Sequence, residues 1–244
     1  MLAIFKREIT TFFTSAVGYL VIGLFLILSG LFLWVFKGAF NVFDYGFADL
    51  EPFFQLAPWV FLFVIPALTM KSFSEEKKLG TLELLLIKPI PLRQVVGGKF
   101  FGILTLAILA VLPTLLYVLT VFRLGITEGN VDMGVVLGSY FGLLLLIACY
   151  AAIGIFASIQ TDNQIVSFIT ATVLCFILFY GFDAAATLFP TGNFGWLLKN
   201  IGMKSHFDGF TRGILDSRDL VYFVSLSFLF LALTVIQLQN TKRS

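Results

Sequence analysis

The chain is 244 residues long; 59% of them are hydrophobic, only 12% are charged, and the formal net charge at pH 7 is +2. Soluble domains are nearer half apolar and a quarter charged, so this composition excludes an ordinary soluble globular protein, and the near-neutral charge gives no indication of a nucleic-acid partner. Several apolar runs of about eighteen or more residues can each cross about 30 Å of hydrocarbon, which predicts an all-α polytopic membrane protein rather than a barrel of alternating strands.

Residues 1–15 predict an amphipathic helix that lies in the membrane interface before the first span. Leu2, Ile4, Phe5 and Ile9 are apolar, and charged or hydroxyl side chains stand between them, a spacing typical of interfacial helices. A secretory signal peptide is a poor alternative, because the positive charges lie well before a long apolar run and no small-residue cleavage site follows it. We expect an uncleaved N-terminal helix.

The apolar runs predict six transmembrane helices. They cover about residues 17–36, 56–70, 100–122, 134–158, 165–182 and 220–238. Pro58 and Pro66 within the second span predict kinks there, and the third span carries Pro113 at its middle. Small residues in the fourth span, such as Gly142 and Gly154, indicate close helix packing in preference to a substrate site.

The segment 71–91, which we call the charged elbow, stands out between two apolar runs and predicts a structured loop rather than a passive turn. Ser72 and Glu75 fit a capping box at the start of a short helix. Gly80 interrupts that helix, and a second helix is expected from Thr81 to about Ile87, ahead of the prolines.

Residues 183–219 form a longer segment between the fifth and sixth spans that is apolar but broken by Pro190 and by glycines such as Gly192. We expect short helices that dip into the membrane face and pack partly against the bundle. A surface that docks a partner is the alternative interpretation.

Basic residues gather on the side of the two termini, which six spans place together. They are Lys6, Arg7, Lys71, Lys77, Lys78, Lys88, Arg93, Lys99, Lys242 and Arg243. The two short loops opposite carry only Lys37 and Arg123, and acids offset the basic residues of 183–219. The positive-inside rule therefore predicts that both termini and the charged elbow are cytoplasmic.

Motifs for catalysis or nucleotide binding are missing from the sequence. Gly97, Gly98 and Lys99 lack the earlier glycine and the following hydroxyl residue of a phosphate loop, so the chain is not expected to bind ATP in that way. Cys149 and Cys175 fall inside predicted spans and favour buried apolar packing, which leaves no metal site to expect. Scarce charges in mid-span disfavour a proton carrier, and a membrane enzyme is equally disfavoured. An energy source on another protein would fit.

The charged elbow contains a recognisable motif. It reads FSEEKKLGTLELLL over residues 73–86, with Pro89 and Pro91 following. This resembles the signature of the ABC-2 type transporter permeases, and the resemblance extends to the N-terminal helix, the six spans, the turn at 161–164 and the stretch 207–216. Within that family the chain is most similar overall to gliding-motility-associated permeases of the Bacteroidetes, although export permeases and a permease of nitrous-oxide reductase maturation share the motif.

The resemblance implies one permease domain over residues 1–244 in a bacterial inner membrane, with a second membrane subunit or a second copy as partner. It also implies a separate ATPase that carries ATP and magnesium and docks on the charged elbow. The family's coupling segment corresponds here to Phe73, Glu75, Glu76, Gly80, Thr81, Leu82, Glu83 and Leu85. Glu83 is suited to a charge-assisted bond in a basic groove, and Leu82 and Leu85 are suited to filling it. The alternative is an elbow that only rests on lipid headgroups.

Two hypotheses for function follow from these observations. In the first, the chain is a permease subunit whose spans are driven by a partner ATPase, for export or for a change of shape across the membrane. In the second, it is a membrane scaffold of a motility or secretion machine, through which no substrate passes. The sequence names no substrate.

Overall fold

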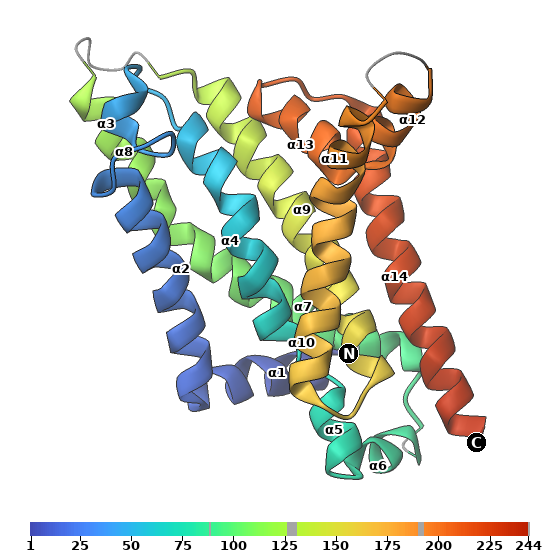
Figure 1. The fold of residues 1–244 in the computed structure, drawn as a ribbon. Coiled ribbons are helices and arrows are strands. Elements are labelled where there is room, and N and C mark those ends of the chain that lie inside the picture. Colours follow the sequence, from blue (N-terminus) through green and yellow to red (C-terminus); the bar gives the residue numbers. More distant parts are fainter. Residues whose placement is uncertain (88, 126–130, 190–192, 244) are drawn as a thin grey trace.

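In a computed structural model of the chain, which describes residues 1–87, 89–125, 131–189 and 193–243, nearly all of these residues are helical and none forms a strand (Figure 1). The expected all-α membrane fold is confirmed. Lys88, Pro190 and Gly192, which entered the sequence analysis, lie outside the described residues.

The N-terminal helix α1 (Leu2–Thr14) precedes α2 (Ala16–Trp34) at an angle of 71° and lies across the lower end of the bundle in Figure 1. Its buried residues are Ile4, Glu8 and Phe12, one on each successive turn, and they face α7 (Leu92–Val111). A Cβ atom at Gly18 would lie 2.6 Å from the carbonyl oxygen of Phe12, so this position requires glycine for the sharp entry into α2.

The remaining spans follow the predicted order. They are α4 (Glu51–Thr69), α7 with its continuation η1 (Leu112–Thr114) and α8 (Leu115–Leu124), α9 (Met133–Gln160), α10 (Gln164–Phe176) with η2 (Ile177–Gly181) and α11 (Phe182–Thr187), and α14 (Ser217–Arg243). Among the described residues, five helical segments are long and apolar enough to cross a membrane, and a sixth is present if α1 and α2 together form one span.

Pro58 and Pro66, where kinks were predicted, lie inside α4 without a break in the helix, whereas the third span changes its helix type at its proline. Pro113 stands in the 3₁₀ turn η1 between α7 and α8, because proline cannot donate the backbone bond that a continuous α-helix needs. The second span begins at Glu51, five positions before the predicted start, since Pro52 is well suited to a first helical turn and Phe53 and Phe54 are buried.

The core is built around α9, which packs against α4, α7, α10, α13 (Met203–Thr211) and α14. Its glycines mark the closest approaches: a Cβ at Gly154 would meet Thr69 Oγ1 at 2.1 Å, and one at Gly142 would meet Phe210 Cβ at 2.5 Å. The small residues of α9 therefore serve helix packing, as predicted.

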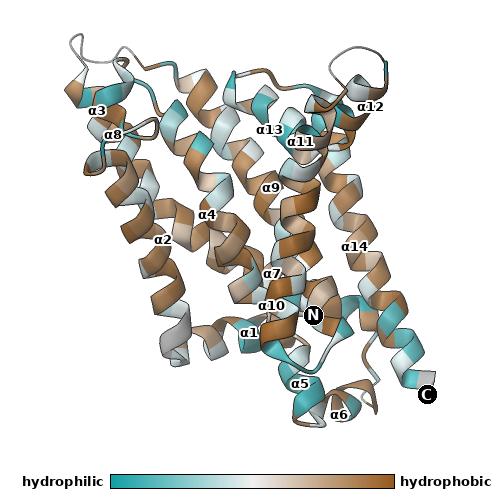
Figure 2. Cartoon of the chain, in the orientation of Figure 1, coloured by the Kyte–Doolittle hydropathy of each residue, from teal (hydrophilic) through white to brown (hydrophobic). Residues whose placement is uncertain are grey.

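The side opposite the N-terminal helix carries α3 (Val42–Tyr45), α11, α12 (Asn193–Ile201) and α13. Met203, Phe207 and Phe210 of α13 are buried, while α12 keeps Trp196 and Leu197 exposed. In Figure 2 the long spans are coloured mainly as hydrophobic, whereas hydrophilic residues are concentrated towards the two ends of the bundle. Short helices packed partly against the bundle were expected for 183–219, and the structure confirms them.

The contact at Gly154 gives a test of this packing. We expect Gly154→Ala to lower the free energy of unfolding by at least about 1 kcal/mol, because the added methyl group forces Thr69 away from α9. The matched control is Gly23→Ala on α2, where a Cβ would meet nothing within 4 Å and alanine favours the helix. Unfolding by SDS titration measures both; equal stability of the two variants would contradict the packing described.

Candidate functional site

The charged elbow forms two short helices below the ends of the spans (Figure 1). They are α5 (Ser74–Lys78) and α6 (Thr81–Ile87), separated by Gly80, whose φ of 67° lies in the left-handed region that favours glycine. The predicted break and the second helix are confirmed.

The predicted capping box at Ser72 and Glu75 is wrong. Helix α5 begins at Ser74, its N-cap position is Phe73, and no side chain caps it. The Ser72 hydroxyl is buried and has no hydrogen-bond partner among the described residues, and the Ser74 hydroxyl donates to the carbonyl oxygen of Met70. The hydrogen bonding of these two serine side chains is therefore determined by the burial of the turn between α4 and α5, and the local capping pattern does not predict it.

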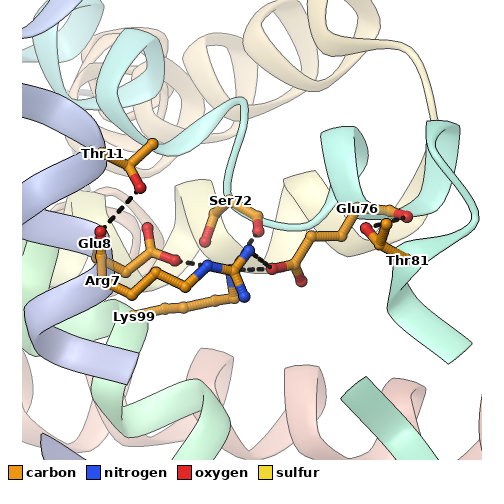
Figure 3. A network of polar contacts seen from close by, with 7 residues as sticks. All are labelled: Arg7, Glu8, Thr11, Ser72, Glu76, Thr81 and Lys99. Carbon is orange, nitrogen blue, oxygen red and sulfur yellow. Dashed lines mark hydrogen bonds and ion pairs between the residues drawn. The ribbon is translucent and has the colours of Figure 1, made fainter. Parts of the chain in front are cut away.

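A buried ammonium group lies where the elbow meets the bundle (Figure 3). Lys99, on the second turn of α7, is only 2% exposed. Its Nζ donates to Glu8 Oε1 at 2.8 Å, to Glu76 Oε1 at 3.1 Å and to the Ser72 carbonyl oxygen at 2.6 Å. The same nitrogen lies 4.9 Å from the centroid of the Phe73 ring. These contacts join α1, α5 and α7 at one charge.

Two further contacts tie α5 to the rest of the chain. Arg7 of α1 donates to Glu76 Oε1 at 2.9 Å, so this carboxylate oxygen receives bonds from two cations. Lys77 Nζ donates to the carbonyl oxygen of Ile159 at 2.5 Å, at the end of α9, where a positive charge favours the helix terminus. The inner face of the elbow is thereby fixed to the N-terminal helix and to two spans.

A pocket of about 310 Å³ opens between α1 and the elbow. Charges of both signs line it, including Arg7, Lys71, Glu75 and Glu76. The second oxygen of Glu76 is buried without a hydrogen-bond partner among the described residues. This oxygen and the Ser72 hydroxyl are thus two buried polar groups beside the pocket that lack a partner among the described residues.

The outer face of α6 presents Leu84 and Ile87 beside two polar residues, Thr81 and Glu83. Leu84 is 63% exposed and Ile87 78%, and Leu79, just before the glycine, is 66% exposed. A short helix that presents large apolar side chains and one carboxylate outside the bundle is suited to contact another surface.

The predicted coupling residues divide between these two faces. Phe73, Glu76, Leu82 and Leu85 are buried within the chain. Glu75 is half-buried at the pocket, whereas Gly80, Thr81 and Glu83 are exposed. Leu82 and Leu85, which were expected to fill a partner's groove, pack against the chain's own core instead. Leu84 and Ile87 take the exposed positions.

Sequence reasoning missed the buried centre of this site. Lys99 and Arg7 entered the sequence analysis as basic residues on the side of the termini, and Glu8 was not singled out, yet all three position the elbow. An available signal was the glutamate at position 8 on the same helical face as Ile4 and Phe12, since an acid on the apolar side of a helix needs a cation opposite.

A second pocket, of about 370 Å³, lies on the opposite side of the bundle between α4 and α13. Glu51, Lys204, Asp208 and Arg212 contribute to its lining. Burial raises the pKa of Asp208, although Lys204 and Arg212 act against this change. Its lysine is already paired with Asp183 at 3.2 Å, so the pocket is partly neutralised. Among the described residues, no three metal-ligating side chains gather at either pocket or elsewhere.

Comparisons with known proteins give one positive result. Residues 48–195, more than half of the chain, match the family described as ABC-2 family transporter protein. A search of curated proteins finds no match. The matched range includes the charged elbow and the spans from α4 to α11.

The buried ammonium gives the test for this site. We expect Lys99→Met to lower the free energy of unfolding by about 3–5 kcal/mol, because it leaves Glu8 and Glu76 buried with one cation fewer. Lys6→Met on the exposed side of α1 is the control that loses the same charge from the surface. Differential scanning fluorimetry in detergent, with SDS titration for the free energy, compares them. Similar stabilities would contradict the assigned role of Lys99.

Proposed function

The chain belongs to the ABC-2 family of transporter proteins, membrane subunits that work with an ATPase partner, and we propose that its charged elbow is where that ATPase docks. In this proposal, nucleotide binding by the partner moves α6 and, with it, α5; the contacts of α5 with α1, α7 and α9 pass the movement to the spans. The chain itself carries neither ATP nor magnesium.

The single observation that supports the proposal most strongly is the division of the elbow into two faces. The inner face is fixed by the Lys99 contacts and by Lys77, whereas the outer face presents Leu84 and Ile87. A segment that transmits movement needs one face fixed to the spans and one face exposed to the partner. A helix without fixed contacts would move by itself and leave the spans in place. The spans then shift between two populated arrangements according to the state of the partner.

An elbow that rests on lipid headgroups remains the alternative to docking. Glu83 favours docking, because it lies on the exposed part of α6 and anionic headgroups would repel a carboxylate. A basic groove on an ATPase would bind it with a charge-assisted hydrogen bond, while Leu84 and Ile87 contact apolar walls. The pocket beside α1 offers a second contact, in which charges of both signs, including Lys71 and Glu75, line the opening.

Orientation and biological setting belong to the same proposal. The basic residues on the side of the termini support a cytoplasmic location for the elbow in a bacterial inner membrane. The resemblance of the sequence to gliding-motility-associated permeases supports a gliding-motility complex with a second membrane subunit or a second copy of the chain, and the family match supports the wider ABC-2 assignment. A permease subunit driven by the ATPase is preferred over a scaffold through which no substrate passes, because the family that the chain matches is described as a transporter family.

Docking makes a direct prediction for Glu83. We expect Glu83→Arg to reduce copurification of the ATPase at least about tenfold, because it replaces the proposed charge-assisted bond by repulsion. The variant should still reach the membrane and fold, since Glu83 is exposed. Quantitative mass spectrometry after affinity purification measures the ratio of ATPase to chain. The control Lys6→Glu reverses an exposed charge on α1, on the same side of the membrane, and should retain the partner. Normal recovery of the ATPase with Glu83→Arg would count against docking through α6.

Measurements of ATP hydrolysis and substrate movement in reconstituted vesicles distinguish the transport hypothesis from the scaffold hypothesis. We expect the purified complex to hydrolyse ATP and to accumulate or release a lipid-like or amphiphilic substrate, and Glu83→Arg to abolish both activities. ATP hydrolysis without movement of any substrate drawn from the native membrane would favour the scaffold.

A further inference from the structure

A groove of about 450 Å³ lies between the beginning of α7 and the second half of α14, away from the charged elbow's docking face. On α7 it is lined by Arg93, Val96 and Gly97, which share one face of the first two turns. Gly97 has no side chain, and a Cβ there would lie 3.6 Å from Met1 Cε and within 4 Å of no atom of α14. Helices α7 and α14 pack against each other, which makes the groove a seam between two spans.

The wall on α14 is a continuous apolar stripe. It consists of Phe228, Leu231, Ala232, Val235 and Ile236, spaced three and four residues apart, and ends at Gln239. At 1.5 Å per residue, the distance from Phe228 to Gln239 is about 16 Å. This equals about half of the 30 Å hydrocarbon thickness, which is the depth of one leaflet. The groove therefore has the length of one acyl chain.

A positive charge stands at the end of the groove nearest the membrane surface. Arg93 is exposed, and no carboxylate among the described residues forms an ion pair with it. A guanidinium group presents several donors in a plane that matches phosphate oxygens. Gln239 adds an amide at the same end.

From these observations we propose that the groove binds one anionic phospholipid from the leaflet on the side of the chain termini. The phosphate contacts Arg93, and one acyl chain lies along the α14 stripe from Ile236 towards Phe228. The lipid would then bridge α7, which carries Lys99, and α14. This inference goes beyond the proposed docking of an ATPase and does not depend on it.

A second copy of the chain fits the groove less well. An occupying span would have to bring an acid to Arg93, and the exposed acids described on this side, Glu83 and Asp162, lie on the elbow and in the turn after α9. A phospholipid supplies the negative charge and the apolar chain in one molecule.

The test uses the full-length chain, purified in mild detergent together with whatever subunits accompany it. Native mass spectrometry follows the binding of phosphatidylglycerol and of phosphatidylcholine with identical acyl chains. Arg93→Gln removes the charge, Ala232→Phe fills the groove, and Lys6→Gln removes an exposed charge on the same side that does not line it.

We expect the wild type to bind phosphatidylglycerol more tightly than phosphatidylcholine. Arg93→Gln should weaken phosphatidylglycerol binding about fivefold, equivalent to about 1 kcal/mol, and remove the preference. Ala232→Phe should weaken binding of both lipids, and Lys6→Gln should change neither. If Lys6→Gln and Arg93→Gln weakened phosphatidylglycerol binding equally, the proposal would be overturned, because the lipid would then be attracted by the overall positive charge of this side and not by a site at Arg93. If Ala232→Phe left lipid binding unchanged but abolished a dimer, the groove would be a contact between protein chains, and the proposal would also be overturned.

Discussion

The structure at the elbow depends on one buried positive charge. Taking an ammonium group such as Lys99 out of water costs several kcal/mol unless partners surround it, and here two carboxylates and a backbone carbonyl oxygen do so. Those partners come from α1, from α5 and from the turn that precedes α5, so these segments can lie together only in the arrangement that satisfies the lysine. The position of α6 outside the bundle follows from that constraint, because α6 is attached to α5 by a single glycine turn.

This arrangement explains how a short segment could control long helices. Glu76 receives bonds from Arg7 and Lys99, and its neighbour Lys77 reaches the end of α9, the most enclosed span. A displacement of α5 would therefore act on three helices together, whereas the exposed face of α6 is left for a partner. The lipid groove beside α7 lies on the same helix as Lys99, so the bilayer and the partner would both act on the base of one span.

Much of this fold could be predicted from the sequence. The burial of individual side chains in the elbow could not, for physical reasons. Apolar runs predicted the spans, and Gly80 predicted the break in the elbow, because both signals are local. The different roles of Glu75 and Glu76 were not predictable, since adjacent residues on a helix face different directions and only the positions of α1 and α7 decide which is buried. For the same reason, the sequence could not show that Leu82 and Leu85 are buried whereas Leu84 is exposed. The assignment of the elbow to ATPase docking stays a prediction.

The most direct test of that assignment is photo-crosslinking from the exposed face of α6. A photoreactive amino acid replaces Leu84, which is 63% exposed, and the same residue replaces Leu20, which is 65% exposed on α2 and serves as a lipid-facing control. Irradiation of intact cells followed by mass spectrometry identifies the adducts. The account predicts an adduct with a P-loop ATPase from position 84 and none from position 20. Adducts with lipid alone at position 84 would contradict it and would mean that the elbow lies on the membrane surface.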